Sequence, residues 1–301
     1  MGADSRSIYL HMGGQTAGAE DVVVYLAANR AGLRRAGFGL YCFDPASSGP
    51  DSLAACLPGL NADEAAVAAA AASLSARFGP DRRAGADGFV ISASDLAGPS
   101  ADLLLGRFYP KARMRARILR RALGSPLERL VMVAEPYETL FHAVWMAAAL
   151  DRRMDPFAEY AEALTRFQGG WADLAEIMME ELEPRELIIQ ARPTVAAQTL
   201  SDLLPGLTLR QPVKPHAKPP LTPSAVAMAQ RCMAQGLRLA PGQRDRLVAF
   251  HARQKQVEPD LGLSALALAD LRGRYVSDLD ALARHSAVTV IGDQIPAMAA
   301  E

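Results

Sequence analysis

The fold is decided by three consecutive pieces of sequence: SIYLHM at 7–12, GGQTAGA at 13–19 and EDVVVYLAANRAGLRRAG at 20–37. A β-compatible run, a glycine-rich turn and an amphipathic helix make the first unit of a phosphate-binding α/β domain. The unpaired N–H groups and the dipole at the start of such a helix favour an anion. However, Thr16 stands where a phosphate loop normally has its lysine, and Glu20 adds a negative charge to the first turn. The loop therefore has the backbone pattern of a nucleotide site without its charge.

This stretch resembles the opening of bacterial sulfotransferases of the P-loop type, which runs roughly Leu-His-Ile-Gly-x-x-Lys-Thr-Gly-Thr-Thr. A helix then follows that ends in Asn-Arg, a leucine and a glycine. The residues that match are Leu10, His11, Gly13, Gly18, Leu26, Asn29, Arg30, Leu33 and Gly37. The resemblance implies that the loop holds the 5′-phosphate of the sulfuryl donor PAPS through Gly13, Gly14, Gln15, Thr16, Ala17, Gly18 and Ala19. Among these positions, Thr16 replaces the family's lysine, and Ala17 and Ala19 replace threonines.

The family's second donor element resembles Arg-x-Pro followed by a helix with a serine, which together grip the 3′-phosphate. Pro136 is retained here, but Ala134 stands at the arginine position and His142 where the serine would be. An arginine at such a site works through a planar fork of donors, so alanine removes the contact. Arg192, after a predicted strand at 186–191, matches a recurring Arg-Pro of the family and is the last candidate donor position.

Two histidines are the candidate catalytic residues. His11 precedes the glycine loop, and His142 lies in a predicted helix at 137–150, where it could act as a base. For His142 a structural place against Trp145 is the favoured alternative. An acidic run later in the chain is interpreted as a solvated helix end, because its spacing is not that of a known metal site; its members are Glu180, Glu181, Glu183 and Glu186.

A strongly basic helix is predicted at 109–123. One interpretation is a patch for an acidic glycan or a nucleotide phosphate. The favoured interpretation is a solvated helix face, since the charges fall around much of the helix rather than on one stripe. The basic residues are Lys111, Arg113, Arg115, Arg117, Arg120 and Arg121.

Composition limits the class of protein. A chain of 301 residues, 50% of them hydrophobic, can bury a sizeable core, and its net charge of −1 gives no reason to expect nucleic acid as a partner. Cys42, Cys56 and Cys232 have the spacing of neither a disulfide framework nor a zinc site, so a reducing cytoplasm is expected. No signal-peptide pattern is recognised, and no segment approaches the ~20 apolar residues of a membrane span, so no membrane partner is expected.

Strands alternate with helices along the chain, which predicts an α/β fold: a P-loop/sulfotransferase-like parallel sheet flanked by helices, with a helical C-terminal part. The expected division is an α/β body at 1–207, a Pro-rich connector at 208–223, and helices at 224–301 packed on the body. A Tyr-x-x-Asp pattern in the last helix resembles the family's closing helix. The buried face of this helix is expected to be Leu271, Tyr275, Leu279 and Leu282.

Sulfuryl transfer depends chiefly on positioning and on charge stabilisation. Because the residues for both ends of the donor are replaced, we expect a sulfotransferase-like protein that is catalytically lapsed or repurposed to bind a ligand or partner, such as a glycan or a protein. The alternative is an active PAPS-dependent sulfotransferase for a glycan or other hydroxyl acceptor, with cations from Arg192 or the helix at 113–121. A P-loop kinase is disfavoured, since a Gly-Lys-Ser/Thr ending is missing. PAPS or PAP is the cofactor expected if the donor site works.

Overall fold

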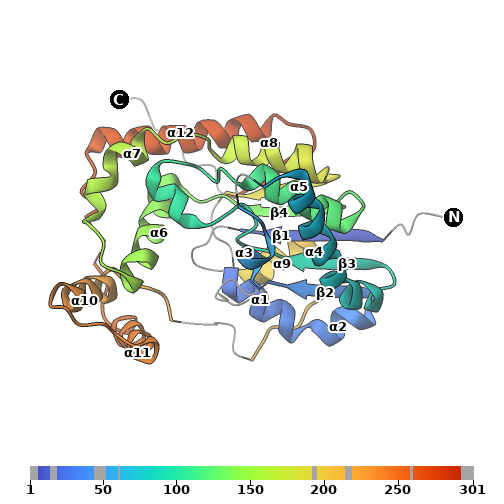
Figure 1. Cartoon of the computed structure of the whole chain (residues 1–301), viewed down its shortest axis with the longest axis horizontal. Helices are drawn as coiled ribbons and strands as arrows, with labels where there is room; N and C mark the ends of the chain where they lie inside the picture. The colour runs from blue at the N-terminus through green and yellow to red at the C-terminus, as the bar shows by residue number, and fades with distance from the viewer. Residues whose placement is uncertain are drawn as a thin grey trace.

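Parallel strands form one sheet in the computed structural model, which describes residues 6–13, 19–43, 52–59, 62–191, 195–213, 219–257 and 260–292. The order across the sheet is β2-β3-β1-β4-β5-β6 (Figure 1). The strands are β1 (Ser7–Met12), β2 (Phe38–Cys42), β3 (Gly88–Ser92), β4 (Arg129–Val133), β5 (Glu186–Gln190) and β6 (Val288–Ile291). The predicted α/β fold with a parallel sheet is therefore confirmed.

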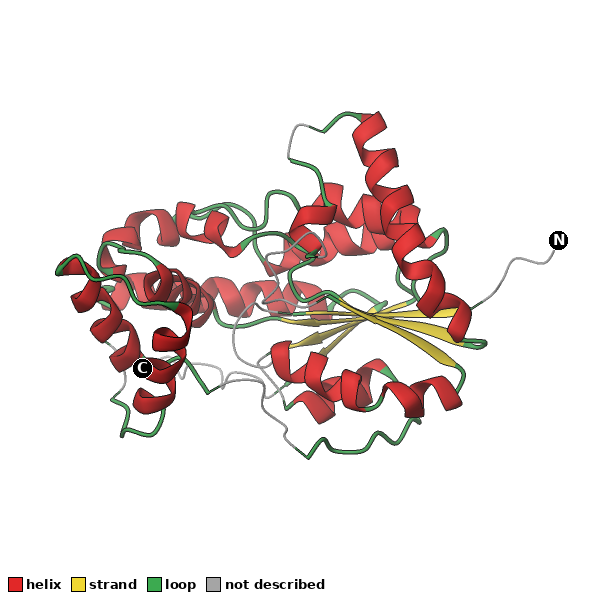
Figure 2. Cartoon of the chain, turned by 60° about the horizontal axis from the view of Figure 1, so that its bottom comes forward, coloured by secondary structure: helices red, strands yellow, loops and turns green. Residues whose placement is uncertain are grey.

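Helices lie on both sides of the sheet (Figure 2). One face carries α1 (Ala19–Ala28), α2 (Arg30–Arg35) and α9 (Ala196–Leu203). The other face carries α3 (Leu53–Cys56), α4 (Glu64–Ala84), α5 (Ala112–Leu123), α6 (Tyr137–Asp151), α8 (Trp171–Leu182) and α12 (Ala265–Ala283). The remaining helices are the 3-10 turns η1 (Ser100–Leu105) and η2 (Phe157–Tyr160), α7 (Ala161–Thr165), α10 (Pro223–Ala234) and α11 (Pro241–His251).

The inner strands of the sheet are buried on both faces, as parallel sheets covered by helices require. Successive side chains of a strand point to opposite sides. In β1, Ile8 and Leu10 enter the core on the α4–α5 side, whereas Tyr9 packs against the core formed with α1, α2 and α9. All five residues of β3 are buried. The apolar runs that predicted these strands are thus explained by burial on two sides.

The chain changes direction across the sheet between β1 and β4. From β1 it passes through α1 and α2 to β2 on one side, and from β4 it passes through α6 and α8 to β5 on the other. These two strands are neighbours, and Leu10 is paired with Leu130. Ligands of open parallel sheets bind outside the carboxyl ends of the strands at such a point. Gly13, which follows β1 directly, lies there.

Two helix boundaries differ from the prediction. The single helix expected within 20–37, from Glu20 to about Ala36, is wrong: α1 ends at Ala28 and α2 begins at Arg30. Between them, the buried side-chain amide of Asn29 donates to the Tyr25 carbonyl at 2.9 Å. The basic helix begins at Ala112 rather than at Tyr109, because Tyr109 has a left-handed φ of 47°.

The C-terminal helices make extensive contacts with the sheet and its helices. Strand β6 pairs in parallel with β5, and α12 packs against α8 and α6. Gln230 of α10 donates to the Arg152 carbonyl at 2.7 Å, at the end of α6. The expected buried face of α12 is confirmed: Leu271, Tyr275 and Leu282 are buried, and Leu279 is half-buried.

Candidate functional site

The candidate site is the carboxyl edge of the sheet around β1, β3 and β4. Of the predicted donor positions, Gly13 and Ala134 are described and lie at this edge, directly after β1 and β4. Ala19 is the first residue of α1. Gly14, Gln15, Thr16, Ala17, Gly18 and Arg192 lie outside the described residues.

His11 is buried under the start of the glycine loop. Its Nδ1 lies 3.0 Å from the hydroxyl oxygen of Ser92 on the neighbouring strand β3. A Cβ atom on Gly13 would lie 3.4 Å from its Nε2, so the other ring nitrogen faces the beginning of the loop. Burial lowers the pKa of His11 to about 4. The ring is therefore neutral at pH 7 and supplies no positive charge for a phosphate.

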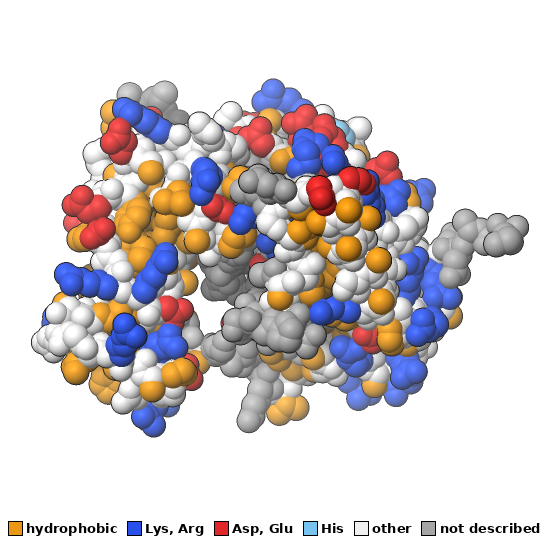
Figure 3. Space-filling view, viewed as in Figure 1, with side chains coloured by type: hydrophobic (Ala, Val, Ile, Leu, Met, Phe, Trp, Pro, Cys, Tyr) orange, Lys and Arg blue, Asp and Glu red, His pale blue; other side chains and the backbone are white. Residues whose placement is uncertain are grey.

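Most of the basic helix α5 points away from this edge, into a set of ion pairs with other helices. Arg113 and Arg117 both bond Glu181 of α8, and Arg120 bonds Glu183. Over α5 and α8 basic and acidic side chains alternate on the surface (Figure 3). These pairs agree with the favoured interpretation of a solvated helix face, and they also account for much of the acidic run.

Arg115 is the exception in α5. It is 4% exposed, and its Nε and Nη2 atoms have no hydrogen-bond partner among the described residues. It faces Asp95, three residues beyond the end of β3, and burial raises the pKa of that carboxyl against the opposing effect of Arg115. Burial likewise lowers the pKa of Arg115. A buried guanidinium thus lies near a half-buried carboxylate without a direct hydrogen bond between them.

This pair could have been found in part from the sequence. Arg115 belongs to the apolar stripe of α5, whose other buried members are Ala112, Ala116, Ile118, Leu119, Ala122 and Leu123. Arg115 comes three residues after Ala112, so it lies on the same face of the helix and points toward the core. Asp95 follows a buried strand, where polar residues of a parallel sheet gather. Their proximity depends on the path from η1 to α5, which has no sequence signature.

A second carboxylate lies at the same edge. Glu135 follows β4 and is 1% exposed, and its backbone carbonyl accepts a bond from Trp171 Nε1 at 2.8 Å. Burial and the Glu135 charge both raise the pKa of Tyr109. Tyr109 keeps a left-handed backbone, which is uncommon outside glycine and tends to occur where local structure enforces it.

Ala134 is fully buried, and its backbone is used in the fold. Its N–H donates to the Gln190 carbonyl at 2.8 Å, and its carbonyl accepts a bond of 2.8 Å from the Tyr275 hydroxyl. The position where the resemblance places an arginine therefore has a methyl group enclosed by the core.

His142 makes aromatic contacts. Its ring stacks on Trp145 at a centroid distance of 5.8 Å and meets Phe157 edge to face at 5.2 Å. Burial lowers the pKa of His142. These contacts agree with the structural place that was the favoured alternative.

The Tyr-x-x-Asp pattern of α12 is part of a hydrogen-bond network beside the edge. The Asp278 carboxylate accepts from the Tyr137 hydroxyl and, at 2.9 Å, from the backbone N–H of Trp171. The same N–H lies 2.8 Å from the Tyr137 hydroxyl oxygen. The network joins α12 to the beginnings of α6 and α8.

No cluster of three or more His, Cys, Asp or Glu side chains suited to a metal ion occurs among the described residues. Within the same residues, no helix combines the length and apolar character needed to cross a lipid bilayer. Neither models of known protein families nor curated proteins match this sequence.

Proposed function

We propose that the protein is a sulfotransferase-like binding protein, catalytically lapsed or repurposed, that holds a ligand or supports a glycan or protein partner. The observation that carries the proposal is Ala134, which is fully buried where the resemblance requires the arginine for the 3′-phosphate. An arginine cannot be supplied there by a change of rotamer. The proposal includes a bacterial, cytoplasmic setting; the three cysteines, whose spacing suits no disulfide framework, fit a reducing compartment.

The charges at the described part of the edge also disfavour a nucleotide with several phosphates. Asp95 and Glu135 place two carboxyl groups there against the one guanidinium of Arg115. His11 is neutral at pH 7, and the exposed arginines of α5 are paired with glutamates. Two unit charges about 4 Å apart interact by roughly 4 kcal/mol at an effective dielectric constant near 20. The missing lysine at Thr16 and the added charge of Glu20 therefore oppose donor binding.

The alternative, an active PAPS-dependent sulfotransferase for a hydroxyl acceptor, has one specific observation in its favour. Arg115 is a buried cation at the carboxyl edge with two unused donor atoms. A fork of this kind binds a sulfate or phosphate group in two places at once. Asp95 beside it already offsets much of the charge, which is why we rank this alternative second.

Titration calorimetry with PAP distinguishes the two. We expect weak or no binding by the wild type. The variant Thr16→Lys/Glu20→Thr should gain affinity by several kcal/mol, or more than about a thousandfold, if the backbone cradle is intact. The matched control Thr16→Met/Glu20→Thr has a long side chain without the charge and should gain much less. Tight binding of PAP by the wild type would instead establish the enzyme alternative and justify a sulfuryl-transfer assay.

A further inference from the structure

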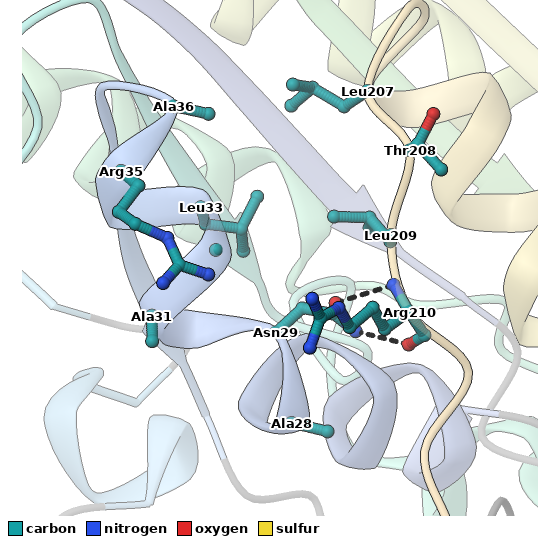
Figure 4. A pocket seen from close by; sticks show the side chains of 11 residues that line it. Ala28, Asn29, Ala31, Leu33, Arg35, Ala36, Leu207, Thr208, Leu209 and Arg210 are labelled. Atoms are coloured by element: carbon teal, nitrogen blue, oxygen red, sulfur yellow. Dashed lines mark hydrogen bonds between the residues drawn. The ribbon is translucent and has the colours of Figure 1, made fainter.

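A pocket of about 260 Å³ lies where the C-terminal end of α1 meets α2, away from the carboxyl edge of the sheet. Residues of the α1–α2 junction form one wall, and the segment 207–210 after α9 forms the other (Figure 4). Since α1 rises ~1.5 Å per residue, Ala28 at its end is about 14 Å from Ala19 at its beginning. The pocket is therefore distinct from the candidate site.

The two walls of the pocket are joined by the side chain of Asn29, which hydrogen-bonds the backbone of Arg210. Asn29 Nδ2 donates to the Arg210 carbonyl at 2.8 Å, and Asn29 Oδ1 accepts from the Arg210 N–H at 2.8 Å. Asn29 is 6% exposed, so its side chain is shielded from water, whereas Arg210 is exposed. They fix the segment 207–210 beside α2 without filling the space between them.

The floor of the pocket is apolar. Leu33 is fully buried, and Leu207 and Leu209 pack against the same core. Gly32 also lines the pocket, and a Cβ atom added to it would meet nothing within 4 Å. A short hydrocarbon or aromatic group would therefore find apolar contacts on three sides.

The charged part of the lining is wholly positive. Arg35 and Arg210 line the pocket, and none of the described residues that line it is acidic. Within the described chain neither guanidinium has an ion pair or hydrogen bond, unlike Arg30, which bonds Asp81 at 3.1 Å. Basic side chains also gather on the surface around α2 (Figure 3). Two unpaired guanidinium groups beside an apolar floor match an anionic head with an apolar body.

We propose that this pocket binds a small amphipathic organic anion, with a carboxylate or sulfate head between Arg35 and Arg210 and a short apolar body against the leucines. The volume is slightly below the roughly 300–1,000 Å³ of sites for drug-sized ligands, so the ligand is a small one. This proposal is independent of the carboxyl edge and of its function.

The test follows leucine methyl resonances by NMR while hexanoate is added to the whole chain. We expect the methyl groups of Leu33, Leu207 and Leu209 to shift in a saturable way. Arg35→Ala and Arg210→Ala should each weaken the binding of hexanoate about 1.5- to fivefold, the range for exposed charge pairs, and the double variant should weaken it more. The backbone bonds of Arg210 to Asn29 are kept in these variants. Arg34→Ala, on the same helix but outside the lining, is the matched control and should leave the affinity unchanged.

A second variant tests the location. Gly32→Leu places a side chain in open space on a helix, so it should fold and should abolish the shifts. The proposal is overturned if hexanoate causes no saturable shift, if 1-hexanol binds as well as hexanoate, or if inorganic phosphate does. Unchanged hexanoate affinity in Gly32→Leu, with the fold shown intact by its spectrum, would equally overturn it.

Discussion

The hydroxyl of Tyr275 in α12 donates to the carbonyl of Ala134 at 2.8 Å, across 141 positions of sequence. Ala134 is the residue at which β4 passes into the candidate site, and Tyr275 is 1% exposed. The same hydroxyl also contacts the carbonyl of Ala191 after β5. One phenol group of the C-terminal part thus joins the ends of two neighbouring strands.

Tyr275→Phe should lower the free energy of unfolding by about 1–3 kcal/mol, because it leaves a buried carbonyl without its donor while keeping the ring. Urea denaturation measures this change. Tyr160→Phe is the control, since Tyr160 is half-buried and its hydroxyl has no hydrogen bond within the described residues. Equal stability of the Tyr275→Phe variant and the wild type would show that the bond does not contribute.

Gly170→Ala should destabilise the network of Tyr137 and Asp278. A Cβ atom at this position would lie 2.5 Å from Asp278 Oδ2 and 2.8 Å from the Tyr137 hydroxyl oxygen. Overpacking of this kind costs about 1–3 kcal/mol. Gly273→Ala should instead stabilise the fold. Nothing lies within 4 Å of its added Cβ, and alanine is more favourable than glycine inside a helix by about 0.5–1 kcal/mol. Thermal denaturation of both variants checks the two signs together.

The sequence predicted the sheet well, because its inner strands are short apolar runs buried on both faces, as in 187–189 of β5. Helix boundaries were less predictable. At the break between α1 and α2, Asn29 bonds the backbone of Arg210, a residue far along the chain, and no local pattern reveals that contact. The late start of α5 follows from the backbone of Tyr109, an L-residue for which a positive φ is not the local preference.

The candidate site was predictable in position but not in its chemistry. A glycine loop after the first strand of a parallel sheet must lie at the carboxyl edge. The packing of α5 against α8 decides which arginines turn inward. It buries Arg115 and leaves its neighbours Arg113 and Arg117 to pair with Glu181. The enclosure of Ala134 likewise arises from α12, more than a hundred residues away.

Arg115→Met should destabilise the fold by about 3 kcal/mol, because it leaves the half-buried Asp95, whose Oδ1 atom is shielded from water, without a compensating charge. The double variant Arg115→Met/Asp95→Asn should recover at least half of that loss, since neither charge then remains buried. The coupling energy from the double-mutant cycle is the measurement. Arg113→Met is the control: its side chain is 48% exposed, and it should cost about 1 kcal/mol or less. Purely additive effects of the two substitutions would contradict the pairing.

His11 gives the fold a specific pH dependence. Burial lowers its pKa from 6.5 to about 4, so between these values the unfolded chain binds a proton that the folded protein does not. Stability is unaffected by His11 above pH ~6.5, falls by up to about 1.4 kcal/mol per pH unit as the pH decreases toward 4, and then levels off.

The variant His11→Asn isolates this effect, because all other titrating groups remain. Between pH 7.5 and pH 5 the wild type should lose about 2 kcal/mol more stability than the variant. Urea denaturation at the two pH values measures the difference. The same loss in both proteins would mean that the imidazole is accessible to protons in the folded state.

Removal of everything after Pro223 should give an insoluble or molten product. The fragment lacks α12, whose Leu271, Tyr275 and Leu282 are buried in the core with α6 and α8, and it lacks β6. Near-ultraviolet circular dichroism and binding of a hydrophobic dye are the measurements. A soluble fragment with a sharp thermal transition would show instead that residues 224–301 form a separate module.

The pairing of β6 with β5 also determines how long one edge of β5 stays unpaired during synthesis on the ribosome. Leu187 is paired with Val288, so the outer edge of β5 has no neighbour until another hundred or so residues have been added. At ~5–20 residues per second this interval lasts roughly 5–20 s. During that time the edge of β5 exposes unpaired N–H and C=O groups, with which a strand of another chain can pair. The nascent protein is therefore most open to aggregation late in translation, and the final strand is what protects it.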